Sequence, residues 1–186
     1  MPIYDIQHIT PLTPEQQDDL AESITQIHST KFTTPRMFVQ VKYTDISSTT
    51  TYIGGKRRQG NHIVANVRVG PSRTQADWDD LCRQVLDAWN HAIAVPGAKG
   101  DLTLRSCIIL GGMTAGYEAG FLLPQAGGDV EWLREHMEEF EMKAKAGDEE
   151  FRELVEEVKE RGLLDGVHGK SSKQRLEEML GWGDSA

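Results

Sequence analysis

The chain has 186 residues, of which 38% are hydrophobic and 26% charged, and its formal net charge at pH 7 is −9. This size and composition predict a globular protein of one domain, or of one domain and an appendage. No stretch approaches the ~20 apolar residues of a membrane span, and the acidic balance argues against nucleic acid as a partner. Because there is no signal-peptide pattern and the only cysteines are Cys82 and Cys107, we expect a cytoplasmic protein without a disulfide framework.

Capping signals and hydrophobic periodicity predict a strand, a helix and a strand at the start of the chain. Residues 2–8 alternate as a strand. Thr13 is suited to cap a helix, with Pro14 in its first turn and Gln16 closing a capping box. A second strand is expected over residues 37–43. The segment therefore reads as one β-α-β unit.

The same order of elements recurs further along the chain. The pattern of apolar residues predicts a strand over residues 63–69, a helix over residues 74–93 and a strand over residues 102–110. Two such units imply parallel pairing, right-handed crossovers and helices on one face of a mixed sheet. We therefore predict an α/β (α+β) domain over residues 1–127, whose bare sheet face is buried by oligomerisation.

Residues 128–186 differ from the rest in charge and pattern. They hold 17 acidic and 9 basic residues, so that most of the net negative charge lies in this third of the chain. The spacing of their apolar residues predicts helices throughout, and Gly147 and Gly162 are expected helix ends. This acidic helical extension could cover the sheet, reach over a neighbouring subunit or form a lid, and the sequence leaves these alternatives open.

Three residues in the predicted domain could carry chemistry. Removal of Met1 would leave Pro2 with a free secondary amine, whose pKa falls when it is desolvated near cations, so that it can act as a base. His28 is expected at the edge of the buried helix face, as a satisfied histidine or as a site residue. Arg73 directly precedes the second helix, where it could bind a carboxylate or remain exposed to solvent.

Two further charged residues are weaker candidates. Arg68, on the preceding strand, could supply a second cation or face solvent. Glu118 lies in a mostly apolar run, where a carboxylate is paired, neutralised or positioned for use, or else caps a turn at the edge. The run of cations over residues 56–58 reads as a solvated loop. The histidines and cysteines lack metal-ligand spacing, and we expect no metal site and no cofactor.

The order and spacing of several short motifs over roughly residues 2–135 resemble the tautomerase superfamily, and within it the group around cis-3-chloroacrylic acid dehalogenase. The motifs are Pro2-Ile3-Tyr4, Leu12-Thr13-Pro14 followed by Ala21 to His28, Phe38-Val39-Gln40-Val41, Tyr52-Ile53-Gly54-Gly55, Arg73 with Ala76-Asp77, and Glu118-Ala119-Gly120-Phe121-Leu122-Leu123-Pro124. The resemblance implies two fused β-α-β units in each subunit of a homotrimer whose sheets face inward. It also implies a small carboxylate substrate.

The resemblance further assigns roles to individual residues. Pro2 would be the acid/base, His28 and Arg73 would bind the substrate carboxylate, and Glu118 would activate water. Tyr4, in the first motif, is a further candidate for substrate binding. We therefore predict tautomerisation or hydration of a small unsaturated or 2-oxo acid.

The sequence departs from the family pattern at two places. The second arginine of the family falls on Gly70, and Arg68 could take its place. A strand tyrosine that helps to position water in the dehalogenase falls near Cys107 or Ile109, so that we do not expect dehalogenase activity. These departures keep open an alternative, in which the chain is a non-catalytic binding or interaction protein with the tautomerase fold.

Overall fold

The computed structural model describes residues 1–93 and 101–165 of the chain. The chain divides into two compact units, Met1–Ala126 and Gly127–Ala186.

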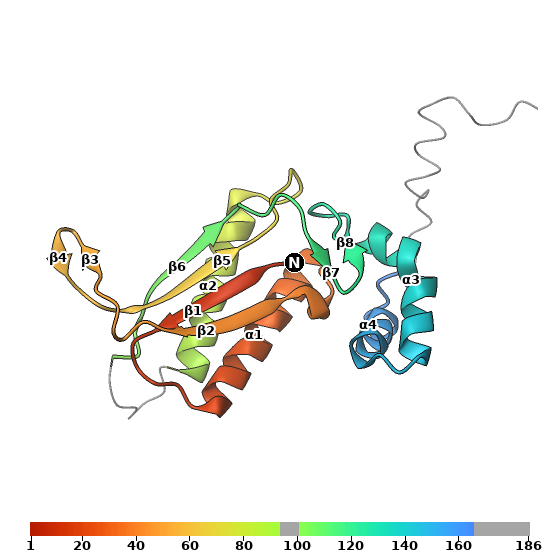
Figure 1. Cartoon of the computed structure of the whole chain (residues 1–186). Coiled ribbons are helices and arrows are strands. Elements are labelled where there is room, and N and C mark those ends of the chain that lie inside the picture. The colour runs from red at the N-terminus through yellow and green to blue at the C-terminus, as the bar shows by residue number, and fades with distance from the viewer. Residues whose placement is uncertain (94–100, 166–186) are drawn as a thin grey trace, which may run out of the picture. The chain divides into compact units, whose positions relative to one another are not determined.

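The first unit is built on a mixed four-stranded sheet with the strand order β2-β1-β5-β6 (Figure 1). The strands are β1 (Ile3–His8), β2 (Gln40–Asp45), β5 (Asn61–Asn66) and β6 (Leu104–Leu110). β1 and β2 pair in parallel, β5 and β6 pair in parallel, and the two pairs join through an antiparallel contact between β1 and β5. The predicted α/β (α+β) fold with two β-α-β units is confirmed.

Two helices cover one face of this sheet, α1 (Pro14–Phe32) and α2 (Gln75–Ala92) (Figure 1). Each begins with a capping box, in which Thr13 pairs with Gln16 and Thr74 pairs with Asp77. Because the box satisfies amide groups that the first turn leaves without partners, it defines where each helix starts. Fully buried apolar side chains from both helices and the central strands form one core, namely Tyr4, Ile6, Leu20, Ile24, Ile63, Ala65, Leu81, Val85 and Trp89.

The strand expected over residues 37–43 begins later, because a short 3-10 turn, η1 (Arg36–Phe38), occupies its first residues. The amides of Phe38 and Val39 bond to the carbonyls of Pro35 and Arg36 and close this turn before the sheet begins. The last strand of the sheet also differs from simple alternation. Its register against β5 shifts between Asn61 and His62, which turns Cys107 and Ile109 toward the core and leaves Ile108 and Leu110 about half exposed.

Each half of the first unit ends in a two-stranded hairpin. β3 (Tyr52–Ile53) pairs with β4 (Lys56–Arg57), and β7 (Tyr117–Glu118) pairs with β8 (Phe121–Leu122). Figure 1 shows the first hairpin at one end of the sheet and the second beside the amino terminus at the other end. The sequence indicates turns here but does not predict these strands.

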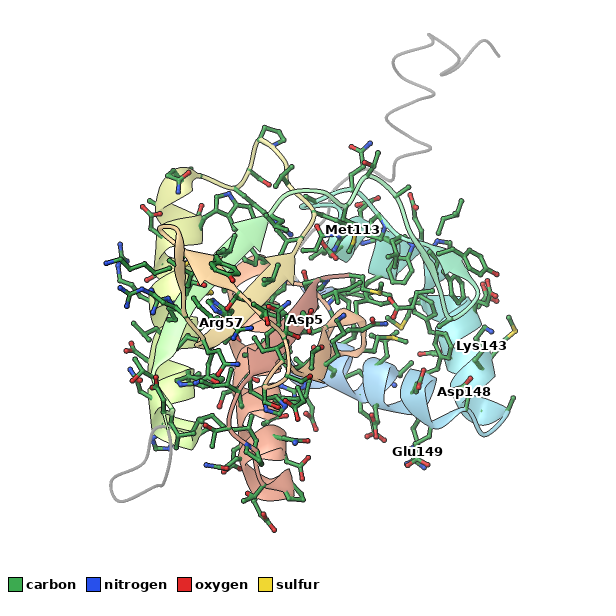
Figure 2. All side chains as sticks on the ribbon, turned by 60° about the vertical axis from the view of Figure 1, so that its left-hand side comes forward. Asp5, Arg57, Met113, Lys143, Asp148 and Glu149 are labelled. Carbon is green, nitrogen blue, oxygen red and sulfur yellow. The ribbon has the colours of Figure 1, made fainter. Side chains whose placement is uncertain are left out.

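The second unit contains two amphipathic helices, α3 (Asp129–Lys145) and α4 (Glu149–Glu160). They pack through Phe140 and Phe151, whose rings stack with their centroids 5.4 Å apart. Gly147 ends the first helix with φ of +97°, a backbone conformation that favours glycine, and Glu149 points into solvent after the connection (Figure 2). The part of the predicted helical extension over residues 166–186 lies outside the described residues.

Candidate active site

His28 is the buried centre of the candidate site. It lies in the last turns of α1, and only 1% of its surface is exposed. Its Nδ1 atom is 2.8 Å from the hydroxyl of Tyr4, which is itself fully buried on the inner face of β1. When the Tyr4 hydroxyl donates this bond, the ring proton is on Nε2, and His28 is itself a donor.

Arg73 lies beside His28 although 45 positions separate them in the sequence. Its guanidinium carbon is 4.3 Å from the centre of the Phe32 ring and 5.8 Å from that of Trp78. The Phe32 ring in turn lies 4.9 Å from the ring of His28. These aromatic faces attract the cation and hold it in place. One Arg73 nitrogen, Nη1, also donates to the backbone carbonyl of Arg68 at 2.7 Å.

The side chain of Arg68 turns to the loop that follows the second hairpin. Its guanidinium donates to the carbonyls of Pro124 and Gln125, and only 7% of the residue is exposed. The same loop approaches Gly70 so closely that a Cβ atom there would lie 3.1 Å from the Cβ of Ala126. A larger side chain at position 70 would therefore require this loop to move. With Arg73, Arg68 is the second cation near His28.

The charges around His28 make the region suited to an anion. Burial, followed by the positive charges of Arg73, the amino terminus and Arg68, lowers the pKa of His28 from 6.5 to about 3. The ring is thus neutral at neutral pH, and the guanidinium groups of Arg73 and Arg68, two residues that are joined by a hydrogen bond, make its surroundings positive. Such a field stabilises a carboxylate or an enolate.

Gln40 forms hydrogen bonds with both Pro2 and Glu118, although the sequence reasoning did not single it out as a site residue. The backbone amide of Gln40 donates to the carbonyl of Pro2 at 3.0 Å, and its side-chain amide donates to Glu118 at 3.1 Å. The second hairpin thereby brings a carboxylate to the start of β1, beside the amino terminus (Figure 1). An amine and a carboxylate near one another can serve as an acid/base pair.

The structure brings the candidate residues into two neighbouring groups. One joins His28, Tyr4, Arg73 and Arg68, and the other joins Pro2 to Glu118. Tyr4 lies behind His28 in the core, where it orients the ring rather than facing solvent.

The sequence reasoning missed Phe32 and Gln40 as site residues. The position of Phe32 four residues after His28 on the same helix is a signal that could have found it. Gln40 carries no comparable signal in the sequence, because its two partners come from distant parts of the chain.

A small cavity of about 220 Å³ adjoins this region. Its lining residues are Val69, Gln75, Trp78, Asp79, Cys82, Ile109 and Gly111. Trp78 belongs both to this cavity and to the aromatic surroundings of Arg73. Among the residues that the structure describes, no group of three or more His, Cys, Asp or Glu side chains could hold a metal ion, and no helix is long and apolar enough to span a membrane.

Comparison with known proteins assigns the family. Residues 1–137 match the model of the Tautomerase_3 family, described as "Putative oxalocrotonate tautomerase enzyme". The chain belongs to this family. The expected membership of the tautomerase superfamily is thereby confirmed. Among curated proteins, none matches the chain.

Solved structures show the same fold at low sequence identity. N1, a member of the cis-3-chloroacrylic acid dehalogenase family, matches with a TM-score of 0.60 and 22% identity, over 82% of this chain and 99% of its own. A wild-type fused 4-OT that is an asymmetric trimer matches with a TM-score of 0.51 and 18% identity, over 64% and 94%. Pt0534, inactivated by 2-oxo-3-pentynoate, matches with a TM-score of 0.50 and 15% identity, over 64% and 95%. The resemblance to the dehalogenase group therefore holds at the level of the fold.

Proposed function

We propose that this tautomerase is an enzyme that moves a proton on, or adds water to, a small 2-oxo or unsaturated carboxylic acid. Its acid/base is the secondary amine of Pro2 after removal of Met1. The observation that carries the proposal is the buried His28, which is bonded to Tyr4 and acted on by the positive charges of Arg73 and Arg68 close to the start of the chain. A negative substrate is attracted to the place where the base would stand.

For a 2-oxo acid, the reaction is an isomerisation that needs no cofactor. The Pro2 nitrogen takes a proton from the carbon next to the carbonyl, and the electron pair of that C–H bond forms a carbon–carbon double bond. The carbonyl π electrons move to its oxygen, which becomes an enolate. The Pro2 ammonium then returns the proton to this oxygen, giving the enol and restoring the amine.

The remaining residues bind and stabilise the anion in this proposal. Arg73 binds the substrate carboxylate, and its fixed position against the rings of Phe32 and Trp78 lowers the ordering cost of that contact. His28, as a donor through Nε2, bonds to the substrate oxygen that becomes negative, and Tyr4 holds its ring. Arg68 adds positive charge from the neighbouring loop.

For an unsaturated acid, Glu118 allows hydration. Glu118 takes a proton from water as the water oxygen bonds to the β-carbon, and protonated Pro2 gives its proton to the α-carbon. The proton on Glu118 then returns to Pro2 through solvent, so that one water is consumed in each cycle. The bond between Gln40 and Glu118 supports this role, because it fixes the carboxylate near the start of the chain.

The direct test compares Pro2→Ala with the unchanged protein in the ketonisation of phenylenolpyruvate. Both proteins are first checked by intact mass for loss of Met1. We expect kcat/KM to fall by about 10²-fold or more, the usual contribution of a positioned acid or base. Pro11→Ala, at an exposed position outside the strands and helices, is the matched control and should leave turnover unchanged. Equal turnover by the Pro2→Ala variant would refute the proposed acid/base.

We further propose that the working form is a homotrimer. The fused 4-OT that shares this fold is a trimer. The exposed apolar residues Ile108 and Leu110, at the edge of the sheet, are suited to a subunit contact. Sedimentation of the purified protein measures this directly, and a monomer at micromolar concentration would contradict it.

A second candidate function is binding without catalysis. The observation that favours it is Gly70, because the Ala126 loop occupies the space of the arginine that the family has there. In that case Met1 remains, and the Pro2 nitrogen is an amide that cannot act as a base. Intact mass distinguishes the two functions, since loss of Met1 is required only for the enzyme.

A further inference from the structure

The two hairpins of the first unit have the same backbone. In one, the amide of Arg58 donates to the carbonyl of Thr51 at 3.1 Å, and in the other, 65 residues later, the amide of Leu123 donates to the carbonyl of Gly116 at 2.9 Å. Both turns have two successive residues with positive φ, Gly54-Gly55 in the first and Ala119-Gly120 in the second. The hairpins are therefore structural counterparts, and their side chains can be compared position by position.

Their side chains have opposite character. The returning strand of the second hairpin carries Phe121-Leu122-Leu123, and Phe121 is buried with 6% of its surface exposed. The same positions of the first hairpin are Lys56-Arg57-Arg58, which are exposed. The carboxylate of Glu118 has Ile53 as its counterpart. Residues 46–60 thus hold three cations and no carboxylate, in a chain of net charge −9.

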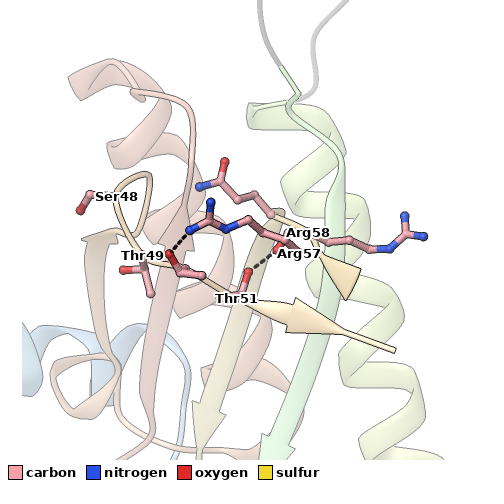
Figure 3. Close-up of a pocket in the computed structure, with 7 residues that line it drawn as sticks. Ser48, Thr49, Thr51, Arg57 and Arg58 are labelled. Atoms are coloured by element: carbon pink, nitrogen blue, oxygen red, sulfur yellow. Dashed lines mark hydrogen bonds between the residues drawn. The ribbon is translucent and has the colours of Figure 1, made fainter. Parts of the chain in front are cut away.

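The first hairpin also borders a cavity of about 430 Å³ that is lined by polar side chains alone (Figure 3). The lining residues are Ser48, Thr49, Thr50, Thr51, Arg57, Arg58 and Gln59. Arg57 extends across the hairpin and donates from Nη2 to the hydroxyl of Thr50 at 2.8 Å. A guanidinium among hydroxyl groups offers several donors at once to a tetrahedral anion.

Local contacts hold this loop in shape. The hydroxyl of Thr51 donates to the carbonyl of Arg58, and the side chain of Gln59 donates to the carbonyl of Ser47 at 2.9 Å. At the start of the loop, the amide of Ser47 donates to Asp45 at 2.8 Å. The donors that border the cavity therefore stand on a loop whose ends are tied together, which lowers the entropic cost of binding.

We propose that this cavity binds a phosphate dianion, either free or carried by a small polar molecule. Arg57 supplies a charged donor beside the threonine hydroxyls, which supply further donors, and Arg58 borders the cavity and adds positive charge although its side chain points the other way (Figure 3). The lining residues are of polar types, which disfavours an apolar ligand, and no carboxylate is among them to repel an anion. The site lies at the opposite end of the sheet from the amino terminus (Figure 1), and the inference does not depend on the proposed function.

Titration calorimetry with inorganic phosphate, glucose 6-phosphate and glucose tests this proposal. We expect both phosphates to bind and glucose not to bind. Equal affinity for the two phosphates assigns the site to the free ion, and tighter binding of glucose 6-phosphate assigns it to a phosphorylated small molecule. The doubly substituted Arg57→Gln, Arg58→Gln protein should bind at least about tenfold more weakly, because the charged donor of Arg57 and both positive charges are lost.

Arg83→Gln is the matched control, since Arg83 is an exposed arginine on α2 away from the cavity, and it should bind phosphate unchanged. Amide NMR shifts locate the ligand, and they are expected at residues 48–59. Thermal unfolding shows whether the doubly substituted protein is folded. We expect it to fold, because both substituted positions are exposed. The proposal is overturned if neither phosphate binds, if the shifts fall elsewhere, or if the folded double variant binds as tightly as the unchanged protein.

Discussion

The two β-α-β units of the first domain share one design but contribute opposite ends to the candidate site. Each unit has a capped helix over two parallel strands. The first β-α-β unit supplies His28 from near the end of α1, whereas the second β-α-β unit supplies Arg73 from just before the start of α2. The sequence alone gives no reason why these two ends should meet.

The antiparallel contact between β1 and β5 provides the reason. Because this contact reverses the direction of the second β-α-β unit relative to the first, the last turn of α1 lies beside the first turns of α2. The ion pair between Lys31 and Asp80, with 2.7 Å between nitrogen and oxygen, marks this meeting. The site therefore belongs to the junction of the two units, and neither unit contains it alone.

The largest expected effect follows from breaking this junction at Arg73. We expect Arg73→Gln to lower kcat/KM for phenylenolpyruvate by between about 10² and 10³, the usual result of removing one preorganised donor. Arg83→Gln, on the exposed face of α2, is the control and should leave kcat/KM unchanged. If Arg73→Gln left kcat/KM unchanged, the second β-α-β unit would contribute no anion contact to the site.

The second prediction concerns the core that the two units share. Leu20→Ala on α1 and Leu81→Ala on α2 each remove a fully buried side chain from the same core. Each should lower the free energy of unfolding by about 3 kcal/mol, because lost burial and a residual cavity add. Urea unfolding followed by circular dichroism measures this. If either variant unfolded in two separate transitions, one for each β-α-β unit, the shared core would not couple the two β-α-β units.

The third prediction uses the buried neutral His28. Its pKa is about 3 in the folded protein and 6.5 without the fold, so that only the unfolded chain takes up the proton as pH falls below 6.5. Stability is therefore lost on acidification, by about 2 kcal/mol between pH 7 and pH 5 from this residue alone. Urea unfolding of the unchanged protein and of His28→Gln at both pH values tests this. The variant should lose less stability over that interval by this amount, and parallel losses would contradict the buried neutral ring.

The smallest expected effects come from the two helix caps, which also test how alike the units are. Thr13→Ala and Thr74→Ala should each cost about 1 kcal/mol of unfolding free energy, because each removes one capping bond to a first-turn amide. Thr30→Ala, at an exposed position in the last turns of α1, is the control and should cost less. A large difference between the two cap variants would show that one unit tolerates fraying that the other does not.

Local chemistry was enough to predict much of this fold. The capping box of the first helix, the order of strands and helices in the two β-α-β units and the helix end at Gly147 follow from short sequence patterns. The family resemblance likewise rests on motifs that can be read one at a time. Pro2, His28, Arg73 and Glu118 could therefore be named as candidates before their positions in space were known.

Only the tertiary structure decided how these candidates combine. The register shift after Asn61 changes which residues of β6 face the core. The hydrogen bonds of Gln40 to Pro2 and to Glu118 join three distant segments. The low pKa of His28 depends on burial and on charges that lie far away in the chain. Long-range packing sets all three, because burial and through-space charge are properties of the assembled core and not of a residue's neighbours in sequence.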